Sequence, residues 1–189
     1  MYHSINTGKP QRTNGPVDIF TVSSHLFKNH IQILANASSL SVVGLMEGLN
    51  SISHDHQTVA ITFDDSYNDN LYTAAPLLIE LGIPFTVFIT SEPVREGKSN
   101  FLTPSEIREL SQLPGVNIGA HGATHTPLTT LDDLALENEL ISSKHYLEDI
   151  IGQKIDMISY PHGAVDMRVR DAVSNAGYKI GACSRFGLN

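Results

Sequence analysis

The stretch VAITFDD, residues 59–65, is a short apolar run that ends abruptly in two adjacent carboxylates, Asp64 and Asp65. An uncharged run rich in β-branched and aromatic residues is typical of a strand buried in a sheet. Two neighbouring buried anions are costly unless a positive group meets them. The pattern therefore predicts a buried strand whose carboxyl end carries the acidic half of a functional site.

Downstream of this stretch, apolar runs that suit strands alternate with segments of helical periodicity. We expect strands at residues 84–90, 116–119, 155–160 and 178–183, and helices at residues 69–81, 103–113, 131–151 and 166–176. The clearest helix start is Thr103, which precedes Pro104 and lies three residues before Glu106, as a capping box requires. This alternation predicts parallel βαβ units in an α/β fold.

Upstream, the sequence predicts a short strand at residues 1–5, a loop at 6–16 and a helix that begins at Ser23 or Ser24. Residues 42–49 suit either a short helix or a strand and turn, and residues 51–57 suit a loop. His3 lies on the predicted first strand and is the one further histidine that we expect near a pocket.

Polar clusters follow three of the predicted strands. They are Asp64 with Asp65, the segment HGATH at residues 121–125, and the segment YPHG at residues 160–163. In α/β folds the carboxyl ends of the strands form the face where ligands bind. Gly122 disfavours a long helix in the second cluster, but a tight loop can still bring its two histidines together. We therefore expect the three clusters to meet at one site.

The residue types of these clusters favour a divalent cation. Asp65, His121 and His125 are common ligands, and two imidazoles with one carboxylate leave a position open for water, as a hydrolytic Zn²⁺ site requires. Asp64 would then act as a base beside the ion. Taken singly, the clusters have plainer explanations: the acidic pair caps the next turn, and the histidines are polar loop residues without a ligand.

The composition limits the remaining possibilities. The 189 residues, 41% of them hydrophobic, suit a single domain spanning residues 1–189. The formal charge of −8 argues against a nucleic-acid or anionic-membrane partner and suits a neutral or cationic substrate. The single cysteine excludes an internal disulfide, and neither a membrane span nor a signal peptide is recognisable. We expect a cytoplasmic protein as the chain stands, or an exported one if the chain is part of a longer protein; the oligomeric state is not indicated.

Three segments resemble, in order and spacing, the motifs of the polysaccharide deacetylase family, which is carbohydrate esterase family 4 or the NodB homology domain. They are TFDD at residues 62–65, HGATH at residues 121–125 and ISYPHG at residues 158–163, and the resemblance runs over most of the chain. It implies a distorted (β/α) barrel with about seven or fewer parallel strands, either complete or incomplete at the C-terminus. It also implies a hydrolase that removes acetyl groups from an N-acetylated polysaccharide or oligosaccharide.

By position, the resemblance implies that Asp65, His121 and His125 are the metal ligands and that Asp64 is the general base. Zn²⁺ is the first choice of ion, with Co²⁺, Ni²⁺ and Mn²⁺ as alternatives, because this ligand set is permissive. The ion and a backbone N–H near His162 would hold the oxyanion.

The resemblance leaves alternative roles open for the residues of the third motif. His162 is a candidate general acid, and the alternative is a residue of the pocket wall that contacts substrate. Tyr160 and Pro161 are candidates to bind the acetylated glycan. Glu137, Glu139 and Glu148 on the long predicted helix are interpreted as a solvated face.

The chain also departs from the family pattern. Ser66 follows the acidic pair where the family usually has Gly, and Ser159 takes the place of an Arg that orients the base. Arg168, Arg170 and Arg185 are the candidates to replace that Arg, with nothing in the sequence to choose among them. The final motif, with its general-acid His, has no counterpart. These departures keep two alternatives open: a weakly active or inactive carbohydrate-binding domain of the same fold, and a hydrolase of other linear or cyclic amides.

Overall fold

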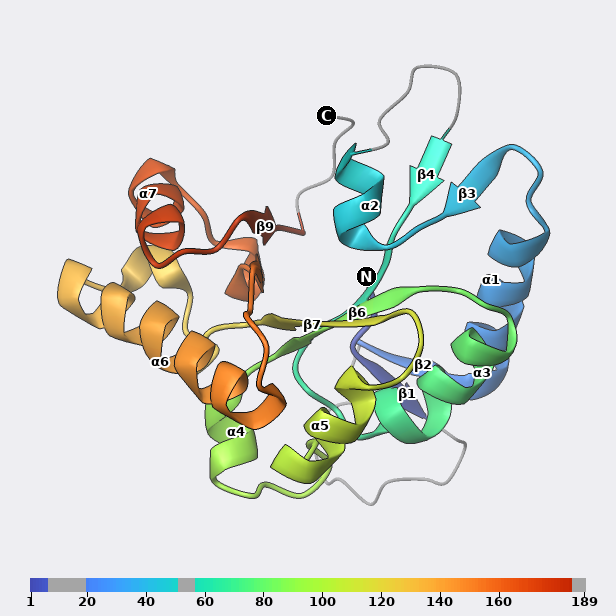
Figure 1. Cartoon of the computed structure of the whole chain (residues 1–189), viewed down its shortest axis with the longest axis horizontal. Helices are drawn as coiled ribbons and strands as arrows, with labels where there is room; N and C mark the ends of the chain where they lie inside the picture. The colour runs from blue at the N-terminus through green and yellow to red at the C-terminus, as the bar shows by residue number, and fades with distance from the viewer. Residues whose placement is uncertain (7–19, 51–56, 185–189) are drawn as a thin grey trace.

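The computed structural model describes residues 1–6, 20–50 and 57–184 (Figure 1). The loops expected at residues 6–16 and 51–57 lie outside the described residues, except for Asn6 and Gln57, which belong to strands.

A curved array of parallel strands forms the centre of the molecule (Figure 1). The main sheet has the order β5 (Ile61–Phe63), β6 (Phe85–Ile89), β7 (Val116–Ala120), β8 (Met157–Ser159) and β9 (Ile180–Ala182). A second sheet, β1 (Ser4–Asn6) with β2 (Thr21–Ser23), continues the array, because Tyr2 forms a parallel bridge with Phe63 of β5. All of these pairings are parallel, so the predicted incomplete (β/α) barrel is confirmed.

The strand expected at residues 59–63 is divided at Ala60. Its first part, β4 (Gln57–Val59), pairs with β3 (Leu40–Val42) in a small separate sheet. Its second part, β5, pairs with β6 in the main sheet. The undecided segment at residues 42–49 is mostly helical, in α2 (Leu45–Asn50).

Most of the expected helices are present, with the expected caps. The helices are α1 (Ser24–Asn36), a π-helical turn (Asn70–Ala74) that continues into α3 (Ala75–Glu80), α4 (Ser91–Arg95), α5 (Pro104–Ser111), α6 (Asp133–Ile151) and α7 (Met167–Asn175), with short 3-10 turns at Leu128–Thr130 and Pro161–Gly163. The capping box of Thr103 and Glu106 is confirmed. The sequence did not predict α4. Among the described residues, no helix combines the length and apolar character that a bilayer span requires.

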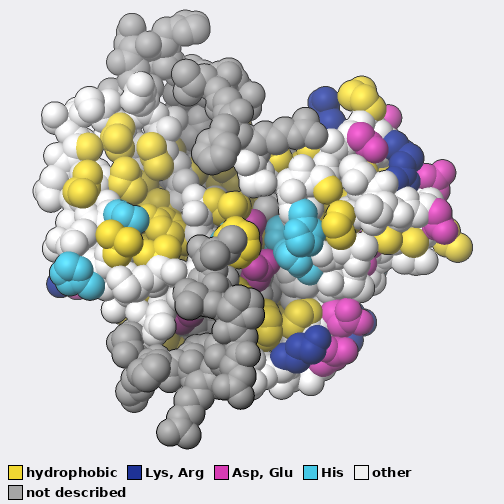
Figure 2. Space-filling model, turned by 180° about the vertical axis from the view of Figure 1, so that it is seen from behind, with side chains coloured by type: hydrophobic (Ala, Val, Ile, Leu, Met, Phe, Trp, Pro, Cys, Tyr) yellow, Lys and Arg dark blue, Asp and Glu magenta, His cyan; other side chains and the backbone are white. Residues whose placement is uncertain are grey.

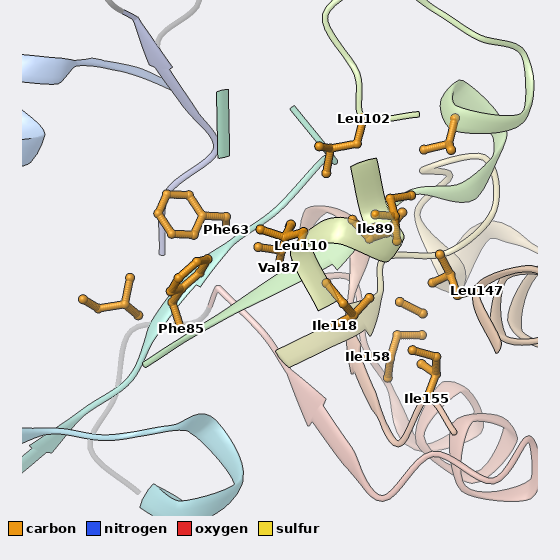
Figure 3. Close-up of a cluster of buried hydrophobic side chains, with 14 of the residues drawn as sticks. Phe63, Phe85, Val87, Ile89, Leu102, Leu110, Ile118, Leu147, Ile155 and Ile158 are labelled. Atoms are coloured by element: carbon orange, nitrogen blue, oxygen red, sulfur yellow. The ribbon is translucent and has the colours of Figure 1, made fainter. Parts of the chain in front are cut away.

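The hydrophobic core lies between the sheet and the helices that cover it (Figure 3). All five residues of β6 are buried, which is expected for a central parallel strand covered on both faces. Phe63 and Phe85 pack edge to face at a centroid distance of 5.8 Å. Each fully buried large side chain contributes about 1.5–3 kcal/mol, so this core fixes the strand ends that carry the polar clusters.

Candidate active site

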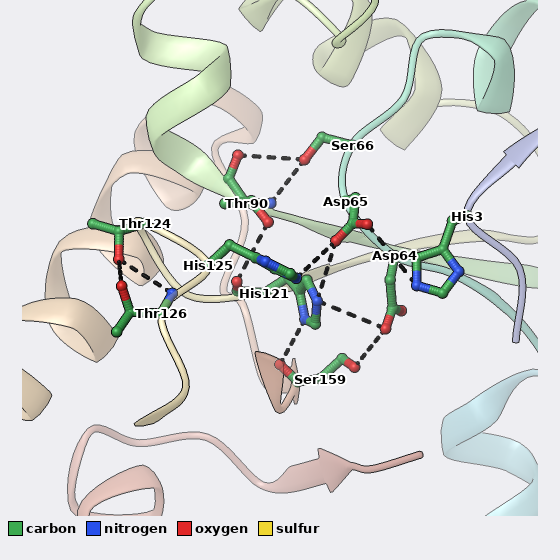
Figure 4. Close-up of polar contacts among 10 residues, drawn as sticks. All are labelled: His3, Asp64, Asp65, Ser66, Thr90, His121, Thr124, His125, Thr126 and Ser159. Carbon is green, nitrogen blue, oxygen red and sulfur yellow. Dashed lines mark hydrogen bonds and ion pairs between the residues drawn. The ribbon is translucent and has the colours of Figure 1, made fainter. Parts of the chain in front are cut away.

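The three polar clusters meet at the carboxyl edge of the main sheet, where all of them line one cavity. Figure 4 shows the first two clusters, together with Ser159 at the end of β8. Asp64 and Asp65 follow β5, His121 follows β7, and Tyr160 follows β8. Because these strands are parallel, their carboxyl ends lie at the same edge of the sheet. Figure 2 shows the resulting group of histidine and acidic side chains beside a hollow in the surface.

Asp65, His121 and His125 come together closely enough to share one ion. One ligand atom from each lies within 4.8 Å of the others. Oδ1 of Asp65 is 3.4 Å from Nε2 of His121 and 3.1 Å from Nε2 of His125. Donor atoms that share a tetrahedral ion at about 2.0–2.2 Å lie roughly 3.3 Å apart, so these separations suit a single divalent cation.

The HGATH loop converges on the site without forming a helix. Gly122 and His125 both adopt positive φ, at 71° and 64°. These two residues turn the chain back, so that the rings of His121 and His125 both face Asp65. A side chain at position 122 would also collide with Oε1 of Glu139, at 2.8 Å from the Cβ position. The glycine of this loop is therefore required by its turn and by its packing.

The side chain of Glu139, on α6, holds the same loop in place. Its Oε1 accepts hydrogen bonds from the backbone N–H of Ala123 at 2.8 Å and of Thr124 at 2.7 Å, and its carboxylate also accepts from the Thr124 hydroxyl. Glu139 is buried, so its interpretation as part of a solvated face was wrong. The missed signal is its spacing: it lies three residues after Leu136 and just before Leu140, on the buried stripe of the helix.

The tautomer of His121 is set by Ser159. Nδ1 of His121 lies 2.9 Å from the backbone carbonyl oxygen of Ser159. A carbonyl oxygen only accepts, so Nδ1 carries a proton and Nε2 is the nitrogen that faces Asp65 and is placed to bind an ion. This arrangement is the usual one for a histidine that binds a metal.

Asp64 is more deeply buried than Asp65 and has a different environment. Its Oδ2 accepts a hydrogen bond from the Ser159 hydroxyl at 2.9 Å. Burial raises the pKa of Asp64, and the neighbouring His121 and Ser159 only partly oppose this. Burial also acts to raise the pKa of Asp65, but there the adjacent imidazoles of His121 and His125 prevail and lower it. Environments that push two carboxyl pKa values apart suit separate acid–base roles.

A further observation supports a bound cation at this group of side chains. Oδ1 of Asp64 and Oδ1 of Asp65 are both buried, and neither has a hydrogen-bond partner among the described residues. Unpartnered buried carboxylate oxygens are costly and call for an ion or an ordered water. The Asp65 oxygen and the two imidazole nitrogens form the mixed N and O ligand set that Zn²⁺ and related ions accept, and the Asp64 oxygen lies beside it.

A cavity of about 290 Å³ opens onto this group. Asp64, Asp65 and both loop histidines line it, and so do Tyr160 and His162. The ring centroid of His162 lies 4.5 Å from that of His125. Pro161 is buried and lies behind the wall, with its Cγ 3.4 Å from the Cβ position of Gly122.

His3 also lines the cavity, as its place on the first strand suggested. Its Nε2 lies 3.9 Å from Oδ2 of Asp65. The position depends on Tyr2, whose N–H donates to the carbonyl of Thr62 and whose carbonyl accepts from the N–H of Asp64. The first strand is thereby fastened beside the acidic pair.

Backbone strain is concentrated around the cavity. Five non-glycine residues of the described ranges have positive φ, and four of them are Asp65, Ser66, His125 and His162. Such angles cost about 1–3 kcal/mol each and persist where the surroundings hold them. At Ser66, where the family usually has Gly, the hydroxyl accepts from the N–H of Thr90 at 2.7 Å and donates to its carbonyl at 3.3 Å.

Comparisons with known proteins agree with the resemblance of the motifs. The family profile described as Polysaccharide deacetylase matches residues 51–181, so this chain belongs to the polysaccharide deacetylase family. YxkH of Bacillus subtilis, which is classed with the polysaccharide deacetylases, is 28% identical over 191 residues, covering 99% of this chain and 64% of YxkH.

Two solved structures share the fold. The deacetylase PplD of Streptococcus pyogenes, in complex with acetate, superposes with a TM-score of 0.84 at 24% identity and covers 98% of this chain and 82% of PplD. The polysaccharide deacetylase BC0361 of Bacillus cereus gives a TM-score of 0.79 at 26% identity, covering 98% of this chain and 57% of BC0361. This chain therefore spans somewhat under two thirds of YxkH and of BC0361.

Proposed function

We propose that this chain is a metal-dependent hydrolase that removes the acetyl group from an N-acetylated glycan, and that residues 1–189 form its single catalytic domain. The observation that carries the proposal is the approach of Asp65, His121 and His125 to within 4.8 Å of one another, beside a second buried carboxylate. The family assignment supports the reaction class.

The proposed cation, Zn²⁺ first among the candidates, would be held by Asp65 Oδ1 and the Nε2 atoms of His121 and His125. When bound, such an ion lowers the pKa of a coordinated water and polarises the acetyl carbonyl. Asp64 accepts the proton of the attacking water at Oδ1, the oxygen without a partner among the described residues. The backbone N–H at His162 donates to the carbonyl oxygen as it gains charge.

Departure of the amine requires a proton on its nitrogen. His3 and His162 are the two histidines of the cavity wall outside the proposed ligand set. His3 is the more enclosed of the two, with 14% of its side chain exposed, so we assign the proton transfer to His3. His162 is exposed and would contact the sugar at the mouth of the cavity.

The proposed fit of the substrate follows from the size of the cavity and from the residues of its wall. At about 290 Å³ the cavity lies at the lower end of the range of roughly 300–1,000 Å³ for small-molecule pockets. One acetylated sugar would occupy it, with the rest of the glycan outside. Tyr160, which is mostly buried in the wall, would provide an apolar surface for that sugar; Pro161 would support the wall from behind.

The test measures metal content and acetate release together. Purified protein should hold about one divalent ion per chain and release acetate from N-acetylated chito-oligosaccharides. Asp64→Asn should keep the ion and lose about 10²–10⁴-fold in kcat, because it removes a general base. An Asp65→Ala, His121→Ala double variant should lose the ion, whereas the surface variant His145→Ala should keep both properties.

The outcomes separate the competing functions. Retention of the ion by the double variant would overturn the ligand set. Ion binding without acetate release from any glycan would favour the non-catalytic carbohydrate-binding domain. Turnover of a panel of small linear or cyclic amides in place of acetylated sugars would assign the chain to a different class of amide hydrolase.

A further inference from the structure

Among the described residues, one side-chain hydrogen bond holds the proposed base. Oδ2 of Asp64 accepts from the hydroxyl of Ser159 at 2.9 Å (Figure 4). Nε2 of His121 lies farther from the same oxygen, at 3.8 Å. Both Asp64 and Ser159 are buried, at 3% and 4% exposure, so solvent does not compete for this bond.

Ser159 makes a second contact, through its backbone. Its carbonyl oxygen accepts from Nδ1 of His121. One residue at the end of β8 thus orients a carboxylate that follows β5 and an imidazole that follows β7. The two contacts use different groups of Ser159, so a substitution of its side chain removes the first and leaves the second.

The arginines available near this region are engaged elsewhere. The guanidinium of Arg168 bonds to Asp133 at 3.0 Å and to the carbonyl of Leu131 at 2.9 Å. Arg170 contacts Met167 on the exposed side of α7. Arg185 lies outside the described residues. The side-chain group that hydrogen-bonds to Asp64 in the described structure is a hydroxyl rather than an arginine.

We propose that Ser159 is the positioning residue of the base: its hydroxyl fixes the Asp64 carboxylate through Oδ2 and leaves Oδ1 to receive the proton. This inference rests on the proposed function for its catalytic consequence. The single bond to Oδ2 restricts rotation of the carboxylate without occupying its second oxygen. In this proposal the Ser159 hydroxyl acts through Asp64 and takes no part in the chemical step itself.

The test compares Ser159→Ala with a matched control, Ser143→Ala, which also deletes a buried serine hydroxyl but on α6 beside Tyr178. Ser159→Ala should keep about one ion per chain, because the carbonyl contact to His121 remains. Its kcat should fall about 10- to 100-fold, as expected for a lost hydrogen bond to a charged group, with little change in KM. Ser143→Ala should keep the wild-type kcat.

A double variant shows whether Ser159 acts through Asp64. Adding Ser159→Ala to Asp64→Asn should cause little further loss, because residues that act as a unit are not additive. Wild-type kcat in Ser159→Ala, or a full additional loss in the double variant, would overturn the proposal. Melting temperatures establish that each variant is folded.

A crystal structure of Ser159→Ala gives a readout that does not depend on activity. The Asp64 carboxylate should rotate away from its wild-type orientation. If the wild type releases no acetate from any glycan, the proposed function fails, and this structure alone decides the positioning role. An unchanged Asp64 carboxylate in the variant would refute it.

Discussion

The carboxylate of Glu139 accepts a hydrogen bond from the backbone N–H of Thr124 at 2.7 Å. Glu139 belongs to the long helix α6, whereas Thr124 lies in the loop that follows β7. The same carboxylate also accepts from the N–H of Ala123, and the two bonds hold the loop segment between the two proposed ligand histidines. The geometry of the site therefore depends on a residue that lies outside the cavity.

Glu139→Ala should loosen this loop. The part-buried hydrogen bonds of the Ala123 and Thr124 N–H groups would be lost, at a cost of about 0.5–1.5 kcal/mol each. Affinity for Zn²⁺ should fall by about 10–100-fold, the usual effect of removing an outer support of a metal ligand. Glu139→Gln keeps a carbonyl acceptor and should lose much less. Competition with a zinc-binding dye measures both variants, and equal affinities for them would contradict the prediction.

His3→Gln and His162→Gln should differ in a way that identifies the proton donor. His3→Gln should lower kcat about 10²–10⁴-fold on an N-acetylated sugar. It should have a much smaller effect on 4-nitrophenyl acetate, whose leaving group needs no proton. His162→Gln should mainly raise KM. The opposite pattern, with a leaving-group-dependent loss in His162→Gln, would move the general-acid role to His162.

Ser66→Ala should be more destabilising than Ser66→Gly. Both variants remove the acceptor of the Thr90 N–H, which costs about 1–3 kcal/mol. Only glycine relieves the φ of 68° at this position, a gain of roughly 1 kcal/mol. Urea unfolding at neutral pH provides the comparison. If alanine proved as stable as glycine, the left-handed conformation of Ser66 would not be strained.

Tyr178 should make the protein sensitive to alkali. Burial raises the pKa of Tyr178, and the partial opposition of the Ser143 hydrogen bond does not cancel this. Its contribution to stability is therefore fully present below the unfolded-state pKa of about 10. The contribution is lost as the pH rises above that value toward the folded-state pKa, because only the unfolded chain then releases the proton.

Tyr178→Phe removes this titration. Above pH ~10 the free energy of unfolding of the wild type should fall more steeply than that of the variant, by up to about 1.4 kcal/mol per pH unit. At neutral pH the variant should be about 0.5–1.5 kcal/mol less stable, since it loses the bond to the carbonyl of Leu140. Urea titrations at several pH values measure both effects, and parallel pH profiles would contradict them.

The features that sequence reasoning predicted are local ones. The capping box at Thr103 is determined by residues within one helical turn. The strands are recognisable because a central parallel strand such as β6 is apolar throughout. The approach of Asp65 to the histidines follows once those strands are parallel, because their carboxyl ends then share one edge.

The features that it missed depend on contacts between distant segments. Sequence reasoning assigns Glu139 to a solvated face and notes Ser159 only as the residue in place of an Arg. The contacts of both arise where α6 and β8 pack against the loop and the acidic pair. The break at Ala60 has a similar origin: β3 pairs with one half of the predicted strand and β6 with the other. The pattern of residues 59–65 does not indicate that two different strands pair with this segment.

The cavity draws its walls from Met1 and His3 at one extreme of the described sequence and from Gly163 and Ser184 at the other. During synthesis the ribosome must therefore release the chain as far as Ser184 before all of these walls can assemble. Nascent or prematurely terminated chains would contain the individual motifs but no assembled pocket. The proposed hydrolysis would then begin only when the two distant parts of the chain have met.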